Sequence, residues 1–180
     1  MKLNIKLALA ILLAFTGPMT DEGIPLREVK AVEEKTETKQ KKPEKAYSIH
    51  GTIPNREWQK YLRSELKKKG IEWYMPYAIC QIYQESRWNP KADNGRDKGL
   101  TQQKGIYWYS RADRYGIKGA DIWDPYAQLH VYACMMAEYL RLAKNDVGWA
   151  LSFYFYGNGQ RADKYVHDVL SHMDYLKEVK

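Results

Sequence analysis

The sequence predicts a mainly α-helical fold, because its apolar residues recur at helical spacing and its turn-forming residues separate these stretches. No convincing alternating pattern, which would indicate β-strands, is present. All 15 tyrosines and all 6 tryptophans lie at or beyond Tyr47. We therefore expect the folded part to span residues 46–180, about 135 residues, which is an ordinary size for one domain.

Two segments of different composition precede this domain. In residues 1–20, Lys2 and Lys6 precede an apolar run that is shorter than the roughly 20 residues of a membrane-spanning helix. This pattern is typical of a secretory signal peptide, with an uncleaved membrane anchor as the alternative. Residues 21–45 are rich in Lys, Glu, Thr, Gln and Pro, which predicts a disordered charged linker. We therefore expect a protein that is secreted or held in the cell envelope.

Start and stop signals divide the domain into helices. Asn55 is a suitable N-cap for a helix that ends at Lys69-Gly70. Pro76 lies near the start of the next helix, where its missing amide hydrogen costs little. The pair Asp124-Pro125 precedes a long helix with an apolar stripe. This long helix is expected at residues 126–144, after shorter helical turns around residues 107–115. Two more helices are expected at residues 147–156 and 162–176.

The most informative stretch is the helix that carries Glu85. Ala78, Ile82 and Glu85 are spaced by four and three residues, so the acid shares a helix face with apolar residues. Burial disfavours the charged form of a carboxyl group and raises its pKa, which allows a glutamate to act as a general acid near neutral pH. Asn89-Pro90 is expected to end this helix, because proline disfavours a helical conformation in the residue before it.

A family resemblance appears at these residues. Residues 85–90 (ESRWNP), Ala92 and residues 99–102 (GLTQ) resemble the signature of the lytic transglycosylase domain related to goose-type lysozyme, which cuts the glycan strands of bacterial peptidoglycan. Thr101 replaces the usual methionine, and Asn94 lies near the position of a customary serine in a short loop. A weaker likeness involves Tyr154, followed by Phe155 and Tyr156 in place of asparagine and alanine, and Tyr165 on a later helix.

The resemblance implies a lysozyme-like fold and a glycan-cleaving lyase that forms 1,6-anhydro-MurNAc. Glu85 would act first as the acid and then as the base. The residues that it implies as substrate contacts are Gln102, Tyr154, Asn94, Ser86 and Tyr165. For Tyr154, a hydrogen bond to Glu85 is the alternative. For Ser86, a hydrogen bond to nearby backbone is an equally ordinary role. Trp88, Tyr107 and Trp108 are candidates for a sugar platform, although we favour a core position for Trp88.

Two other functions remain open from the sequence. A hydrolytic muramidase would need a second carboxylate to activate water, and Asp93 and Asp97 are the candidates in the following loop. A glycan-binding module without catalysis is the other alternative. The net charge of +7 suits an anionic envelope polymer. Because basic and acidic residues are interspersed, we expect no nucleic-acid partner.

Cofactors and covalent links are not indicated by the sequence. His50, His130, His167 and His172 lack metal-ligand spacing, so we expect no metal and no cofactor. The pair Cys80 and Cys134 is compatible with a disulfide in an exported protein and equally with two small buried side chains. We expect a monomer that acts on peptidoglycan glycan strands, with envelope, secretion or conjugation machinery as the class of protein partner.

Overall fold

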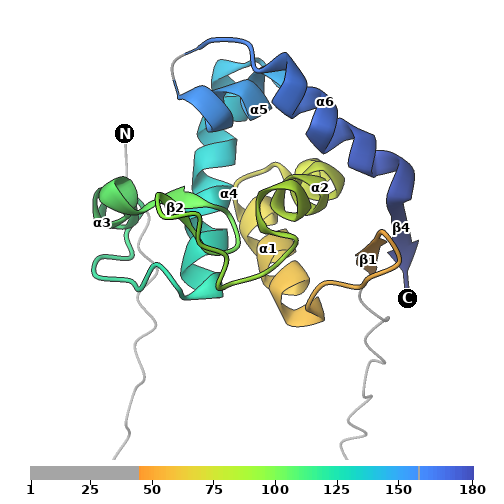
Figure 1. Cartoon of the computed structure of the whole chain (residues 1–180), viewed down its shortest axis with the longest axis horizontal. Helices are drawn as coiled ribbons and strands as arrows, with labels where there is room; N and C mark the ends of the chain where they lie inside the picture. Colours follow the sequence, from red (N-terminus) through yellow and green to blue (C-terminus); the bar gives the residue numbers. More distant parts are fainter. Residues whose placement is uncertain (1–44, 158) are drawn as a thin grey trace, which may run out of the picture. The chain divides into compact units, whose positions relative to one another are not determined.

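The computed structural model of the chain describes residues 45–157 and 159–180. Within these ranges the chain forms six α-helices and only short strands, which confirms the prediction of a mainly α fold (Figure 1). The predicted signal peptide, and the predicted linker apart from Lys45, lie outside the described residues. Across the described part we find no helix with the length and apolar character needed to cross a membrane.

The elements follow one another in a simple order. The α-helices are α1 (Arg56–Lys68), α2 (Met75–Ser86), α3 (Gly105–Arg114), α4 (Pro125–Leu142), α5 (Val147–Tyr156) and α6 (Asp163–Ser171). Two short 3-10 helices are η1 (Glu72–Tyr74) and η2 (His172–Tyr175). The strands are β1 (Ala46–Ile49), β2 (Asp97–Lys98), β3 (Gln103–Lys104) and β4 (Leu176–Val179).

The predicted boundaries of α1 are confirmed by its caps. The side chain of Asn55 accepts hydrogen bonds from the backbone N–H groups of Glu57 and Trp58 at 2.9 and 3.2 Å, which satisfies two amides that a helix start leaves unpaired. The helix ends at Lys68, and Gly70 then adopts a φ of +74°. A residue without a Cβ is favoured at such a left-handed position. Local chemistry is therefore sufficient to explain where α1 begins and ends.

Helix α2 ends earlier than predicted. Its last residue is Ser86, and both Arg87 and Trp88 have positive φ values of 52° and 62°. Asn89-Pro90 therefore follows the turn, and it is not the cause of the helix end. The Trp88 side chain is buried, and its indole N–H donates to the carbonyl of Ile79 on α2 at 3.3 Å. We attribute the turn to this folding back of Trp88 onto the helix, a tertiary contact that proline chemistry could not reveal.

The expectation of no strands is wrong for two short antiparallel pairs. Strand β1 pairs with β4 from Ala46↔Val179 to Ile49↔Leu176, and β2 pairs with β3. The single helix predicted at residues 162–176 is divided into α6, η2 and the first residue of β4. Four residues are too few to establish an alternating pattern, and β1 and β4 lie at opposite ends of the domain sequence. Only the folded chain brings them together.

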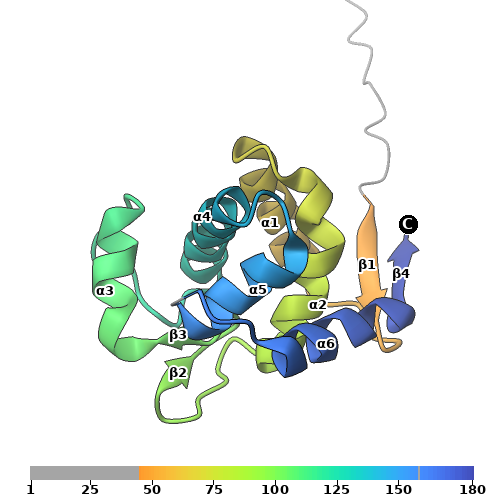
Figure 2. The ribbon, with the colours of Figure 1, turned by 90° about the horizontal axis from the view of Figure 1, so that it is seen from above.

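Helix α4 lies at the centre of the core and packs against α1 and α5 (Figure 2). Its buried residues include Leu129, Tyr132, Met136 and Leu140. Each large apolar side chain that is fully buried contributes about 1.5–3 kcal/mol. A smaller apolar cluster attaches α3 to the other side of α4, where Trp108 is fully buried. This arrangement leaves space between α3 and the C-terminal end of α5, where the pocket described below is found.

The two cysteines are not linked. Cys80 on α2 and Cys134 on α4 are both buried and free. The Cys80 sulfur lies 3.5 Å from the Met173 sulfur. Burial raises the pKa of the Cys80 thiol to about 12. Of the two readings that the sequence left open, the structure therefore favours the small buried side chain.

Candidate active site

Glu85 lies in a pocket of about 560 Å³. The walls of this pocket come from the last turn of α2, the β2–β3 hairpin, the inner face of α3, helix α4 and the end of α5. Besides Glu85, the polar and aromatic lining residues are Arg96, Asp97, Gln102, Gln103, Lys104, Tyr107, Arg111, Tyr139, Tyr154, Phe155 and Tyr156. The pocket therefore joins segments that lie far apart in the sequence around one carboxyl group.

The environment of Glu85 favours a protonated acid. The residue is half-buried in the last turn of α2, and the Tyr165 hydroxyl donates a hydrogen bond to its Oε1. Burial raises the Glu85 pKa to about 7, the Tyr165 hydrogen bond lowers it, and the negative charge of Asp97 raises it. Among the described residues, no lysine or arginine bonds this carboxyl group. A carboxyl group with these properties can hold a proton at neutral pH and release it.

Behind Glu85, a buried polar network fixes the direction of the Tyr165 hydroxyl. The side-chain amide of Gln81 donates to the Tyr165 oxygen at 3.1 Å. The carbonyl oxygen of the same amide accepts from the hydroxyls of Tyr74 and Tyr132 at 3.0 and 2.7 Å. Since Gln81 donates to Tyr165, the Tyr165 hydroxyl is left to direct its own proton toward Glu85. Tyr165 was expected to contact substrate, but its hydroxyl is committed to the acid.

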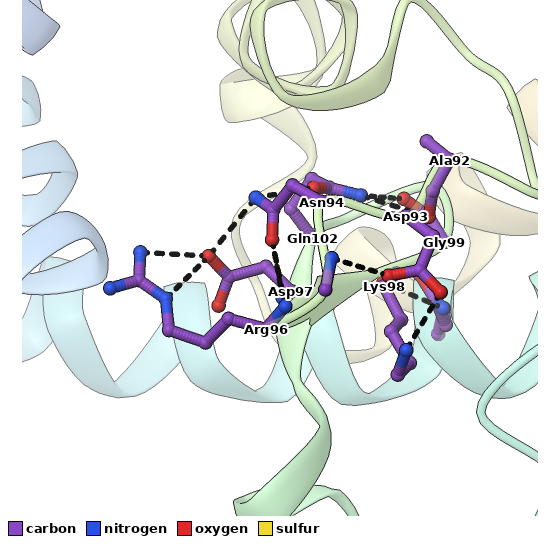
Figure 3. A network of polar contacts seen from close by, with 10 residues as sticks. Ala92, Asp93, Asn94, Arg96, Asp97, Lys98, Gly99 and Gln102 are labelled. Carbon is purple, nitrogen blue, oxygen red and sulfur yellow. Dashed lines mark hydrogen bonds and ion pairs between the residues drawn. The ribbon is translucent and has the colours of Figure 1, made fainter.

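Three other predicted contacts stabilise the loop after α2, and Figure 3 shows two of them, Gln102 and Asn94. The Gln102 amide donates to the carbonyls of Ala92 and Gly99 at 3.2 and 2.9 Å. The Asn94 side-chain oxygen accepts from the backbone N–H groups of Arg96 and Asp97 at 3.0 and 2.8 Å.

The Ser86 hydroxyl donates to the Leu100 carbonyl at 2.7 Å, which ties α2 to the same loop. Ser86 thus takes the backbone-bonding role that was its alternative. Gln102 also lines the pocket, but its amide and the Asn94 side chain are largely occupied within the loop. These three side chains shape the site more than they offer free groups to a ligand.

Tyr154 lies in the pocket, although it does not bond Glu85. Its hydroxyl donates to the Thr101 carbonyl and accepts from the Gln103 amide at 2.7 Å. Thr101 is fully buried, and its backbone N–H donates to the side-chain oxygen of Gln128 at 2.9 Å. A hydroxyl side chain at position 101 is therefore accommodated by a polar cluster. The tyrosine that bonds Glu85 is therefore Tyr165 on α6 and not Tyr154 on α5.

The three candidate platform aromatics are separated by the fold. Trp88 and Trp108 are buried in the core, and the Trp108 indole N–H donates to the Ala120 carbonyl at 2.7 Å. The core position favoured for Trp88 is confirmed, and the platform role of Trp108 is wrong. Tyr107 is 48% exposed and lines the pocket. Phe155, at the opposite wall, is also 48% exposed and stacks on Tyr165 with a centroid distance of 4.6 Å.

The two candidate second carboxylates have different environments (Figure 3). Asp93 is exposed, forms an ion pair with Lys98 at 2.7 Å and does not line the pocket. Asp97 lines the pocket, is only 8% exposed, and accepts from Asn94 and from two nitrogens of Arg96 through Oδ2 alone. Its buried Oδ1 has no hydrogen-bond partner among the described residues. A buried polar atom without a partner is uncommon, and this one belongs to a residue of the pocket wall.

Gln103 and Arg111 were missed at the level of sequence. Gln103 is buried and bonds Tyr154, while Arg111 donates to Gln103 at 2.7 Å. Gln102 precedes β3 with a left-handed φ of 45°, and both Gln102 and Gln103 line the pocket. Arg111 lies four residues after Tyr107 on α3, so the two share a helix face. That spacing was the available signal for Arg111.

The structure offers no obvious metal centre within its described residues, where no group of three or more His, Cys, Asp and Glu side chains is suitably placed. His50 and His172 contact each other, and His130 bonds Glu65. Compared with protein-family models, with curated proteins and with solved structures, the chain shows no match. Its function therefore has to be inferred from the pocket itself.

Proposed function

We propose that the protein is a peptidoglycan lytic transglycosylase with a lysozyme-like fold, and that Glu85 is its single catalytic acid and base. The observation that carries the proposal is the state of Glu85, which is half-buried in a pocket, bonded by a tyrosine and given a pKa of about 7 mainly by burial. General acids work best when their pKa lies near the working pH. The sequence resemblance around Glu85 supplies the substrate class.

The proposed reaction uses the Glu85 carboxyl group twice, first as a proton donor and then as a proton acceptor. The protonated carboxyl group donates its proton to the oxygen between MurNAc and GlcNAc, and the bond from this oxygen to the MurNAc C1 breaks. The resulting carboxylate then accepts the proton of the 6-hydroxyl of the same MurNAc, whose oxygen bonds to C1. The product is 1,6-anhydro-MurNAc, and Glu85 ends protonated as it began. The Tyr165 hydrogen bond stabilises the carboxylate between the two steps.

Hydrolysis is a second candidate outcome, favoured by Asp97. The free Oδ1 of Asp97 is an acceptor on a residue that lines the same pocket as Glu85. A carboxylate in such a position can take a proton from water, as the second carboxylate of an inverting glycosidase does. Asp93 is a weaker candidate because it is exposed and paired with Lys98.

The test is mass spectrometry of the products formed when the full-length protein digests purified peptidoglycan. Muropeptides that end in 1,6-anhydro-MurNAc, one water lighter than reducing ends, are expected. Reducing ends would make the protein a muramidase, and Asp97→Asn should then abolish cleavage while Asp93→Asn has little effect. The absence of products, together with sedimentation of the protein with the wall, would identify a glycan-binding module.

Location and partners form part of the same proposal. Cleavage of peptidoglycan requires export, so the protein would be secreted or envelope-bound and would act as a monomer on glycan strands, without a nucleic-acid partner. Secretion or conjugation machinery is the class of protein partner consistent with such an activity. Fractionation of cells that express the full chain tests the location, and detection of the protein in the cytoplasmic fraction alone would contradict it.

A further inference from the structure

The wall of the pocket formed by β3 and α3 carries two cations that no carboxylate neutralises. Lys104 and Arg111 both line the pocket and are half-buried. Neither forms an ion pair with any described residue. The third cation of the pocket, Arg96, differs because it is paired with Asp97 at 2.9 Å. The pocket thus holds positive charge beyond what its own acids balance.

The guanidinium of Arg111 is held in place by two contacts. Its Nη1 donates to the side-chain oxygen of Gln103 at 2.7 Å, and its central carbon lies 5.6 Å from the centre of the Tyr107 ring. The other guanidinium nitrogens have no acceptor among the described residues. Arginine carries five N–H donors in a rigid planar fork that matches a carboxylate. A half-buried arginine with a fixed direction and unused donors is suited to bind an anion that enters the pocket.

This cationic wall belongs to the same pocket as the proposed acid. Arg111 and Glu85 both line that pocket, and Gln103 connects Arg111 to the Tyr154 hydroxyl, which is a further part of the lining. An anion held by Arg111 would therefore lie within the same site as the bond to be cut. At a pH below about 7, Glu85 is mostly protonated and does not repel such a group.

We propose that Lys104 and Arg111 form a subsite for a carboxylate of the substrate, beside Glu85. The inference rests on the proposed function and narrows it to glycan strands that carry a free carboxylate near the scissile bond. Two sources of this group exist on peptidoglycan. One is the lactyl carboxylate of a muramic residue without its peptide, and the other is a carboxylate of the stem peptide.

Arg111 also has a simpler role, which is to orient Gln103 and, through it, Tyr154. Loss of activity in an Arg111 variant would fit either role. Lys104 separates them, because no hydrogen bond or ion pair of its side chain is present among the described residues. A change at Lys104 therefore tests the charge of the subsite without disturbing the network around Gln103.

The experiment compares four peptidoglycan preparations as substrates for the full-length protein. Intact peptidoglycan and peptidoglycan stripped of peptides by an amidase are each used before and after carbodiimide coupling of their carboxylates to methylamine. The variants are Lys104→Gln, Arg111→Gln and the charge-conserving Arg111→Lys. Lys118→Gln, at an exposed cation that does not line the pocket, is the matched control. Binding of the same four preparations by the Glu85→Gln protein measures how strongly the subsite holds the carboxylate when no cleavage occurs.

We expect the wild type to cleave at least one untreated peptidoglycan preparation about tenfold faster than its methylamide form, as the loss of one charge-assisted contact implies. Lys104→Gln and Arg111→Gln should reduce this preference, Arg111→Lys should keep part of it, and Lys118→Gln should keep all of it. A faster reaction on the stripped peptidoglycan identifies the lactyl carboxylate as the group that the subsite binds. A faster reaction on the intact peptidoglycan identifies a carboxylate of the stem peptide.

Equal cleavage of untreated and methylamide peptidoglycan by the wild type would overturn the proposal of a carboxylate subsite while leaving the proposed function intact. A preference that survives in the Lys104→Gln/Arg111→Gln double variant would overturn it as well. If the wild type cleaves none of the preparations, the proposed function fails. In that case, equal binding of treated and untreated peptidoglycan by the Glu85→Gln protein would also overturn the proposal of a carboxylate subsite.

Discussion

Two glutamates on successive helices have opposite electrostatic environments. Glu65 is in the last turn of α1 and Glu85 in the last turn of α2, and both are sheltered from solvent. Glu65 accepts hydrogen bonds from Lys68 Nζ and His130 Nδ1 at 2.5 and 2.9 Å. Burial pushes the Glu65 pKa upward, but the bonds from Lys68 and His130 outweigh it and the pKa is lowered. At Glu85 no cation of the described part of the chain offsets the effect of burial, and the pKa rises to about 7.

The difference shows that burial by itself does not raise the pKa of a glutamate toward neutrality. Glu65 links α1 to α4 through His130, whose other ring nitrogen contacts the Tyr115 carbonyl at 3.0 Å. It is therefore a structural residue in a satisfied network. Among the described residues, Glu85 has only the Tyr165 hydroxyl as a side-chain partner, and it lines a pocket. The choice of neighbouring side chains, made by the tertiary fold, separates the two roles.

The largest expected effect is on activity. Glu85→Gln should reduce cleavage of peptidoglycan by about 10²–10⁴-fold, the range typical of a lost general acid. Glu65→Gln, an identical change on the neighbouring helix, should retain nearly all activity per folded molecule. Release of soluble muropeptides measures both, and circular dichroism confirms folding. Full turnover by a folded Glu85→Gln protein would contradict the role given to Glu85.

The next effect concerns stability at different pH values. The folded-state pKa of Glu85 is raised from an ordinary 4.5 to about 7, so the folded state binds the proton more tightly than the unfolded state. Glu85 therefore costs the wild type stability as the pH rises from about 4.5 to about 7. Glu85→Gln should remove this cost, which is at most about 3 kcal/mol. Urea unfolding should show that Glu85→Gln gains stability relative to wild type between pH 4 and pH 8.

Glu65 should have the opposite pH dependence. Its pKa is lowered in the folded state, so its carboxylate stabilises the protein above the ordinary pKa of 4.5, and this stabilisation is lost as the pH falls through the lowered value. Glu65→Gln should destabilise the protein by about 2 kcal/mol near neutral pH, because it weakens a buried charge network. The same urea series measures the effect. A destabilisation that does not shrink in acid would show that lost packing, and not lost charge, explains it.

The smallest effect concerns the pH dependence of activity. The Tyr165 hydrogen bond lowers the Glu85 pKa, so Tyr165→Phe should raise that pKa and move the alkaline limit of activity to higher pH. Tyr154→Phe is the matched control, since Tyr154 lies in the same pocket but bonds Thr101 and Gln103. Rates measured from pH 5 to pH 9 compare the two variants. An equal shift in both would show that Tyr165 has no special influence on Glu85.

The sequence by itself determined the elements whose signals are local. The cap at Asn55, the Asp124-Pro125 start of α4 and the span of α5 at residues 147–156 were predicted and are confirmed. The same holds for Glu85 in the last turn of a helix with a partly buried face. Each of these features depends on residues within one or two turns of the chain. Capping chemistry and helical periodicity act over that distance.

The tertiary structure decided which side chains meet at the pocket. It placed Tyr165 and not Tyr154 on Glu85, brought Asp97 and not Asp93 into the pocket, and turned Arg111 toward Gln103. It also paired β1 with β4, which no local sequence pattern predicted. These contacts depend on how helices and strands pack and on the side to which each residue of a strand points. A charge, a hydroxyl or an amide acquires its role only from the neighbours that this packing supplies.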